Sequence, residues 1–443
     1  MSSTISTPSQ AAAGIQSDQE IANLVIMVRA DPIICGHSTE ARNLAEAAIA
    51  RGFHSAHIIS YPIETLQESG LPLKPLETIS AYSDGIVVHR PEQIGDYKVL
   101  DGRLGYAMSG EVVDLISELP GRSIVMDLYI VPHGQMVMNA IETLNYDSGD
   151  RDAITIGEAV GSDITNVVCN ALAEGQVGAA RVVLANFLRH DLPVAVSQYT
   201  KDLIVESGAQ VDAVAGTRYA AELQERVEVS FPAIDTSQYT NIENNSVEVD
   251  QVLESRQLER DGYVMFLSRI APAKGVDDLV DAYRGSELYG QKSLIICGNG
   301  PMKEAIREMT ADDPHIRVLD DVSDEEKGIL MHGCFAYCLP SKPRPEFTET
   351  FGIAVAEKML AGGLGPVITT RTGGIPEATG GHCLEHEAGN TDALRDCLNQ
   401  AYFMTDEERK ELSERSRRFA MQFDRSAILD NLINRSLAVS KLS

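Results

Sequence analysis

Two glutamates eight residues apart stand out among the residues that could do chemistry. In "ETFGIAVAEKML", residues 349–360, Glu349 precedes an apolar run and Glu357 lies inside it. A buried carboxylate costs free energy unless something pairs with it. On a helix, eight residues span roughly 12 Å, about the distance from a sugar to the ribose of a nucleoside diphosphate sugar. A ribose diol would satisfy Glu357, because a carboxylate accepts two hydroxyls.

Two cations in "FLSRIAPAKG" suit the diphosphate of such a compound. Arg269 and Lys274 follow an apolar run that predicts a strand ending at Ser268. Cations at a strand end that faces a cleft could stabilise a diphosphate leaving group. Taken alone, the pair could also be ordinary exposed loop cations.

Glycine turns and a helix start add backbone amides to this set. Gly298, in "CGNG", would let backbone amides approach a ligand. The amides of Phe351 and Gly352 would open the helix that carries Glu357, with its positive end toward an anion. "TGGIPE" supplies a further turn at Gly373.

Alternating strand and helix patterns must position these residues. In the first half, "ANLVIMVRA", "SAHIISY", "SIVMDLYIV", "DAITIG" and "PVAVSQ" predict strands, and helical patterns follow several of them. In the second half, "YVMFLS", "SLIICG", "IRVLD", "CFAYCLP" and "PVITT" predict another set. Such alternation indicates an α/β fold with two Rossmann-like parallel-sheet domains that face a cleft.

The domain boundaries follow from where these patterns stop. We expect a disordered tail over residues 1–20, a first domain over 21–240, a linker over 241–256, a second domain over 257–424 and a terminal helix over 425–443. The linker is predicted because the sequence there loses its periodicity and becomes rich in Asn, Ser and Glu.

Composition restricts the class of protein. The chain has 443 residues, a net charge of −28 and no apolar run near the roughly 20 residues that span a bilayer. Residues 1–250 hold 14 Lys and Arg against 34 Asp and Glu. This balance disfavours nucleic acid and a stable association with an anionic membrane, although a solubility or salt-adaptation role is an equal alternative. Without a signal pattern, and with seven cysteines but no CxxC pair, we expect a cytoplasmic protein.

The motifs together resemble a known family. "SRIAPAKG", "CGNGP", the E-x7-E pair and "TGGIPE" occur in the order and spacing of retaining glycosyltransferases of family 4, which have the GT-B fold. The resemblance covers roughly residues 255–425 well, and it reaches the first half weakly through "AVSQYTKDLI" and "VSFPAID".

The resemblance implies a role for each matching residue of the second half. Arg269 and Lys274 would hold the donor diphosphate, and Glu349 would lie at the hydroxyls of the donor sugar. Glu357 would bind the ribose. The further donor-binding residues would be Ser268, Gly298, Phe351 and Gly352. The terminal helix would cross back to the first domain.

The first half departs from the family pattern. Gly36 matches one of two glycines under the diphosphate, but His37 follows it, and His37 is either an acceptor contact or a solvent-facing loop residue. His133, in "IVPHGQM", is the candidate catalytic residue of this half, with a structural histidine as the alternative. In place of another family histidine, "TIGEAVGSD" supplies Glu158 and Asp163, which are possible acceptor contacts.

These features predict a retaining glycosyltransferase that moves a sugar from a nucleoside diphosphate sugar, of the UDP or GDP type, to a small soluble acceptor. No cofactor or metal is expected, since no Asp-x-Asp motif stands where a metal-bridging site would lie. A homo-oligomer stays open. The alternatives are an enzyme with a lipid or glycan acceptor, a nucleotide-sugar epimerase, and a non-catalytic binding protein.

Overall fold

The computed structural model describes residues 21–31, 36–69, 81–95, 102–148, 152–242, 245–344 and 347–440. The predicted tail, residues 1–20, lies outside these ranges.

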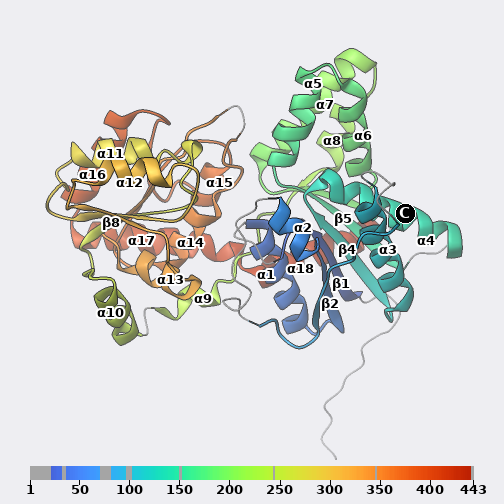
Figure 1. Ribbon diagram of the computed structural model, residues 1–443, viewed down its shortest axis with the longest axis horizontal. Helices are drawn as coiled ribbons and strands as arrows, with labels where there is room; N and C mark the ends of the chain where they lie inside the picture. Colours follow the sequence, from blue (N-terminus) through green and yellow to red (C-terminus); the bar gives the residue numbers. More distant parts are fainter. Residues whose placement is uncertain are drawn as a thin grey trace, which may run out of the picture.

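Two parallel sheets, one in each half of the chain, form the framework (Figure 1). The first sheet has seven strands in the order β3-β2-β1-β4-β5-β6-β7. They are β1 (Ile21–Val28), β2 (Ser55–Ile59), β3 (Ile86–His89), β4 (Arg122–Leu128), β5 (Ala153–Ala159), β6 (Leu192–Ala195) and β7 (Glu228–Val229). The second sheet has six strands in the order β10-β9-β8-β11-β12-β13. They are β8 (Tyr263–Leu267), β9 (Ser293–Cys297), β10 (Ile316–Leu319), β11 (Ala336–Leu339), β12 (Val367–Thr370) and β13 (Leu384–His386).

Helices connect the strands and cover the sheets. Those of the first half are α1 (Gly36–Arg51), α2 (Ile63–Glu68), α3 (Arg103–Glu118), α4 (Gln135–Ser148), α5 (Asn170–Ala173), α6 (Val177–Leu188), α7 (Gln198–Ala215), α8 (Tyr219–Arg226) and α9 (Ser237–Thr240). The others are α10 (Ser246–Ser255), α11 (Val276–Arg284), α12 (Lys303–Thr310), α13 (Asp324–Gly333), α14 (Ile353–Ala361), α15 (Ile375–Thr379), α16 (Thr391–Phe403), α17 (Asp406–Ala420) and α18 (Arg425–Ser440).

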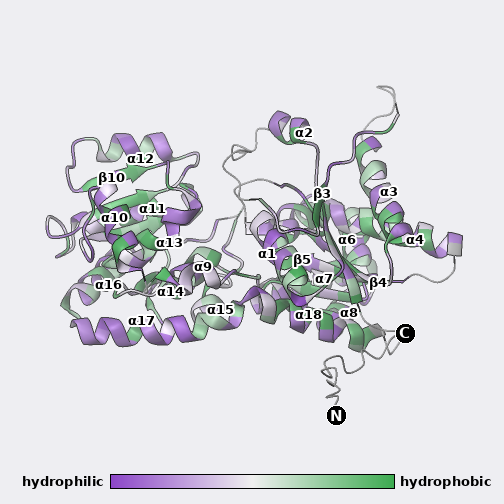
Figure 2. Ribbon diagram, turned by 90° about the horizontal axis from the view of Figure 1, so that it is seen from below, coloured by the Kyte–Doolittle hydropathy of each residue, from purple (hydrophilic) through white to green (hydrophobic). Residues whose placement is uncertain are grey.

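The central strand β1 shows why its apolar run is continuous. Leu24, Ile26 and Val28 pack in one cluster with α1 and α18, while Val25 and Met27 pack in another with α3 and α4. Because a parallel strand is buried on both faces, the run from Leu24 to Val28 is apolar at every position. Figure 2 shows green, hydrophobic strands inside each domain and largely purple outer helices such as α17.

The segment predicted as a linker differs from the expectation. Within 241–256, residues Ser246–Ser255 form α10. Asn245 caps its first turn, and Val249 and Leu253 are buried in the core of the second domain. An apolar stripe at helical spacing thus gives a helix within the segment whose composition predicted a linker.

The terminal helix α18 crosses back to the first domain, as the resemblance implied (Figure 1). Ile428 and Leu432 of α18 join the cluster around β1. The segment that leaves the first domain also pairs with the segment that returns to it before α18. The amide of Ile234 donates to Phe423 O at 2.9 Å, and the amide of Arg425 donates to Ile234 O at 2.8 Å. The two crossings therefore form one connection between the domains.

None of the helices within the described ranges has the length and apolar character required to span a membrane.

Candidate active site

The loops after β8 carry the predicted diphosphate cations. The neighbours of β8 are β9 and β11, so the strand order reverses here, and open α/β sheets bind ligands at such a point. Arg269 lies just beyond β8, next to the predicted donor residue Ser268. Its side chain is exposed and forms no ion pair or hydrogen bond with another described residue. Arg269 is therefore available to a ligand.

Lys274 and Glu349 lie together. The Nζ of Lys274 forms an ion pair with Glu349 Oε2 and lies 4.8 Å from the centre of the Phe347 ring. Both side chains are 13% exposed. Two predicted donor residues from distant parts of the sequence thus meet in one site.

The helix between the two glutamates begins later than expected. Its N-cap is Gly352, at a left-handed φ of 98°, and α14 starts at Ile353. Glu349 is therefore not on the helix, and the expected helical spacing of roughly 12 Å does not apply to this pair. The ring of Phe351 packs against Phe231 and Phe423, with centroids 5.5 and 5.0 Å away, so the start of α14 is anchored to the interdomain connection.

Glu357 is buried, with a partner that sequence reasoning missed. Its carboxylate forms an ion pair with Lys327 of α13. Burial and the hydrogen-bonded carboxylate of Glu357 raise the pKa of the Tyr239 hydroxyl well above its usual value. Tyr239 belongs to α9 in the connection between the domains. No motif indicated Lys327, because it became a neighbour of Glu357 only through the packing of α13 beside α14.

The predicted glycines serve first to let loops approach one another. A Cβ on Gly298, at a φ of 136°, would lie 2.1 Å from Ser268 O. A Cβ on Gly373 would lie 1.9 Å from Glu349 O, and the amide of Gly374 donates to that same oxygen at 2.9 Å. Without side chains, these turns fix the positions of Ser268 and Glu349.

His133 is fully buried beyond β4. Its Nδ1 lies 3.3 Å from Leu128 O, and its Nε2 has no hydrogen-bond partner among the described residues. Burial lowers the pKa of His133 to about 4, with Arg29 contributing in the same direction. The imidazole is therefore neutral near pH 7, and its Nε2 is available.

The two predicted acceptor acids are also fully buried. The carboxylate of Asp163 accepts the amides of Ile130, at 3.1 Å, and Gly161, at 2.9 Å, and those of Val160 and Ile164 as well. Burial raises the pKa of Asp163 to about 6. These bonds connect the loops after β4 and β5, so Asp163 is placed to position these loops.

Glu158 lies against Glu40 of α1, which sequence reasoning missed. Burial raises the pKa of Glu40 to about 7, against the lowering effect of its hydrogen bond with Glu158. Burial also raises the pKa of Glu158 well above its usual value, and the neighbouring Glu40 carboxyl raises it too. The two groups are placed to share a proton.

His37 lies on the first turn of α1. Its ring centroid is 5.9 Å from that of Tyr129, which in turn is 6.5 Å from that of His133. The structure thus brings His37 and His133 close to one tyrosine that the sequence did not single out.

The domains contact each other at the two sets of loops. A Cβ on Gly36 would lie 3.0 Å from Ile353 Cδ1, so the start of α1 faces the start of α14. Glu377, of "TGGIPE", accepts the amides of Gln198 at 2.7 Å and Tyr199 at 3.0 Å, at the beginning of α7 in the first domain. The donor loops are therefore held directly against the first domain.

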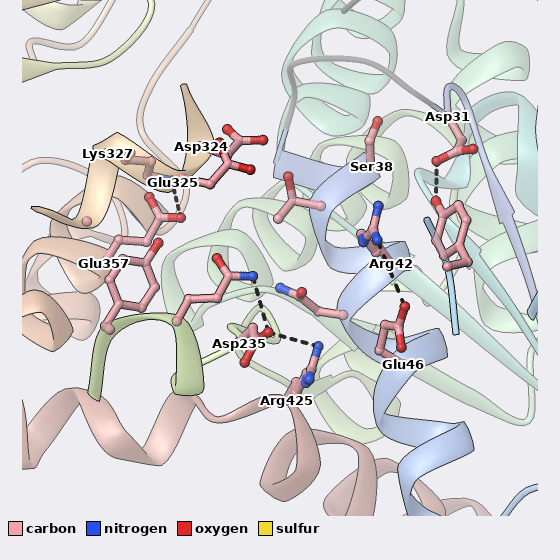
Figure 3. A pocket seen from close by; sticks show the side chains of 16 residues that line it. Asp31, Ser38, Arg42, Glu46, Asp235, Asp324, Glu325, Lys327, Glu357 and Arg425 are labelled. Atoms are coloured by element: carbon pink, nitrogen blue, oxygen red, sulfur yellow. Dashed lines mark hydrogen bonds and ion pairs between the residues drawn. The ribbon is translucent and has the colours of Figure 1, made fainter. Parts of the chain in front are cut away.

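A cavity of about 550 Å³ lies between the domains beside Glu357. Figure 3 shows Lys327 and Glu357 on one side, Arg42 of α1 on the other, and the Asp235–Arg425 ion pair, 3.1 Å long, below. Arg269, Lys274 and Glu349 do not line it. The cavity is thus the part of the cleft on the predicted ribose side. Among the described residues, no three His, Cys, Asp or Glu side chains are grouped to hold a metal ion.

Comparisons with known proteins agree with this arrangement. Residues 251–419 match the family model for glycosyl transferases group 1. Over 115 residues, the chain is 30% identical to the 2-deoxystreptamine N-acetyl-D-glucosaminyltransferase of Niallia circulans. That alignment covers 25% of this chain and 28% of that enzyme. The match confirms the prediction of a glycosyltransferase domain in the second half.

Solved structures resemble the whole chain. HepE of Anabaena in complex with UDP-glucose has a TM-score of 0.63 at 17% identity, covering 94% of this chain and 99% of that one. A glycosyltransferase from Rickettsia africae has a TM-score of 0.66 at 14% identity, with coverages of 96% and 100%. Sucrose-phosphate synthase from Thermosynechococcus elongatus has a TM-score of 0.64 at 15% identity, with coverages of 95% and 100%. These likenesses confirm the predicted GT-B fold.

Proposed function

We propose that the protein is a retaining glycosyltransferase that transfers a sugar from a nucleoside diphosphate sugar to a small soluble acceptor. The observation that carries this proposal is the pair of lysine-held carboxylates, Glu349 and Glu357, in a domain that matches glycosyl transferases group 1. A ligand with hydroxyls at both ends of a diphosphate would engage both acids and the exposed Arg269.

The donor diphosphate is stabilised by the second domain. Arg269 and Lys274 supply positive charge as the C1–O bond of the donor breaks, and the amides at the start of α14 face the same anion. Lys274 would then exchange part of its contact with Glu349 for phosphate oxygens. Glu349 is left to accept hydroxyls of the donor sugar, and Glu357 accepts those of the ribose.

The acceptor reacts from the side of the first domain. Its oxygen forms a bond to C1 on the face that the phosphate leaves, and its proton passes to the departing phosphate oxygen. No protein nucleophile is needed in this scheme. His133, neutral and with a free Nε2, would hydrogen-bond the reacting sugar.

The donor class is UDP or GDP, and the likeness to HepE favours UDP. The Anabaena HepE structures were solved with UDP and with UDP-glucose. The Niallia circulans relative is named for transfer of N-acetylglucosamine to 2-deoxystreptamine, a small acceptor. A thermal-shift panel of UDP-, GDP-, ADP- and dTDP-sugars would identify the base, and no shift with any of them would contradict the donor site.

Transfer by this route is independent of metal ions, because side-chain cations neutralise the diphosphate. EDTA should leave the rate unchanged, and loss of activity restored by Mg²⁺ would contradict this. Retention is tested by NMR of the product, whose anomeric configuration should match that of the donor.

The rival functions have their own tests. Binding to liposomes in a flotation assay would favour a lipid acceptor, and epimerised nucleotide sugar in the absence of any acceptor would favour an epimerase. We also propose a cytoplasmic location, in keeping with the free thiols of the six cysteines in the described ranges.

A further inference from the structure

Arg29 lies at the point where the strand order of the first sheet reverses. β1 has β2 on one side and β4 on the other, and Val28 pairs in register with Leu128. Arg29 and Tyr129 are the first residues beyond these two strands. Ligands of open α/β sheets bind in the crevice at such carboxyl ends. Arg29 therefore has the same place in the first domain that the donor loops have in the second.

Within the described residues, the guanidinium of Arg29 has no acidic partner. It lies 5.9 Å from the centre of the Tyr129 ring, its Nε is buried without a hydrogen-bond acceptor, and no ion pair joins it to a described residue. The nearest acid in the sequence is already used, because Asp31 pairs with Arg90 at 3.0 Å. A buried donor left without an acceptor is costly, so this one is arranged for a partner outside the described chain.

The surroundings of Arg29 suit a sugar. The ring centroid of Tyr61 lies 5.9 Å from that of His133, and the rings of His37 and His133 both lie near that of Tyr129, with centroids 5.9 and 6.5 Å away. Ser162 Oγ donates to the Tyr129 hydroxyl at 3.4 Å. Tyr129 itself has a φ of 107°, which is strained for a bulky residue, and such strain concentrates at functional sites.

The acids behind this crevice do not cancel the charge of Arg29. The carboxylate of Asp163 is occupied by backbone amides. Burial raises the pKa of Glu40 to about 7 and that of Glu158 well above its usual value, so this pair carries less negative charge near pH 7 than two exposed glutamates would. An anion can therefore approach Arg29, although the first half of the chain is strongly acidic overall.

We propose that Arg29 is a specificity-determining residue that binds an anionic group of the acceptor, either a phosphate monoester or a carboxylate. The planar guanidinium can donate two parallel hydrogen bonds to such a group. This inference rests on the proposed glycosyltransferase function and adds the acceptor class to it: a small sugar with a single anionic substituent.

Calorimetric titration separates this site from the donor site. Glucose 6-phosphate, glucuronate, inorganic phosphate and neutral glucose are titrated into the full-length protein and its Arg29→Gln, Arg29→Lys, Arg269→Ala and Arg181→Gln variants. Arg181 is an exposed arginine of α6, so its variant matches the charge change. We expect Arg29→Gln to weaken binding of the preferred anion roughly 10- to 100-fold, the usual effect of a lost charge-assisted hydrogen bond. Arg29→Lys should weaken it less, and Arg181→Gln and Arg269→Ala should leave it within about twofold.

The preferred anion distinguishes a phosphate from a carboxylate acceptor. The proposal is overturned if no anion binds more tightly than glucose, or if Arg29→Gln binds all of them like the wild type. It is also overturned if Arg269→Ala alone abolishes anion binding, because the anion then occupies the donor site. Retained nucleotide binding by Arg29→Gln shows that this variant is folded. Anion binding that depends on Arg29, in a protein that transfers no sugar, would reject the proposed function and leave the anion site standing.

Discussion

The two domains use one strand order for different chemistry. In each sheet the first strand of the domain is flanked by the second and fourth, and an arginine follows it closely: Arg29 after β1 and Arg269 after β8. The shared scaffold therefore places a cation at both edges of the cleft. What each edge can bind depends on the loops around the cation.

The acidic residues at the two edges of the cleft differ in their partners. In the second domain, Glu349 and Glu357 each form an ion pair with a lysine, which a hydroxylated ligand can exchange for its own contacts. In the first domain, Glu40, Glu158 and Asp163 are buried without an ion pair to any described lysine or arginine, and burial raises the pKa of each. One edge thus has acids paired with exchangeable cations, and the other has buried acids whose pKa values are raised.

Removing a cation from the second-domain edge should have the largest effect on turnover. Arg269→Ala or Lys274→Ala should lower turnover by roughly 1000-fold, because each removes positive charge from the diphosphate transition state. Steady-state kinetics with the best donor would measure this, with circular dichroism to confirm the fold. Arg415→Ala, at the surface of α17, is the matched control. Near-normal turnover in either active-site variant would reject the diphosphate assignment.

Substitution of His133, at the first-domain edge of the cleft, should lower turnover less than the loss of Arg269 or Lys274. His133→Ala should lower turnover roughly 100-fold through the loss of one hydrogen bond to the reacting sugar. The free energy of unfolding should change by only about 1–3 kcal/mol, as is typical of a buried substitution. His54→Ala, at an exposed position of the same domain, serves as the control. An unchanged rate would make His133 purely structural.

The buried acids predict a dependence of stability on pH. The folded-state pKa of Glu40, about 7, lies above its ordinary value of 4.5, so the folded protein binds more protons than the unfolded chain between these values. Stability should therefore fall as pH rises through this window, by on the order of 1 kcal/mol per pH unit. Urea unfolding between pH 5 and 8 would measure it. Glu40→Gln should flatten the curve, and equal slopes for both proteins would contradict the shared proton.

The contact that joins the two edges should give the smallest effect. Glu377→Gln weakens the interdomain contact with the amides of Gln198 and Tyr199, because the neutral amide is a poorer acceptor than the carboxylate. We expect donor hydrolysis to increase roughly tenfold relative to transfer, since a looser interface admits water. Product analysis by NMR would give this ratio. Glu385→Gln, elsewhere in the second domain, is a control. An unchanged ratio in Glu377→Gln would show that the Glu377 contact does not keep water out of the cleft.

Local sequence patterns were sufficient to predict the fold and the glycosyltransferase domain of the second half. The strands containing Leu24 and Val264 are buried on both faces, so their continuous apolar runs could be recognised in the sequence. The roles of Glu349 and Glu357 stay predictions. What depends on packing was not predictable. Lys327 contacts Glu357 only because α13 lies beside α14. Arg29 could be placed near Tyr129 only once β4 was known to pair with β1.

Two expectations failed for local reasons. The distance from Glu349 to Glu357 was derived for a continuous helix, but the left-handed Gly352 ends the helix before it reaches Glu349. The linker was predicted from composition, whereas Val249 and Leu253 bury one face of a helix there. In both cases one or two residues outweighed the average character of the segment.

The central claim, that Glu357 binds the ribose of the donor, is tested most directly by a double-mutant cycle. Calorimetry would compare the preferred nucleotide sugar with its 2′-deoxy analogue, in the wild type and in Glu357→Gln, with Lys327→Met as a control for the broken ion pair. We predict that removing the 2′-hydroxyl weakens binding to the wild type roughly tenfold and binding to Glu357→Gln hardly at all. The same loss in both proteins, or no loss in the wild type, would contradict the assignment.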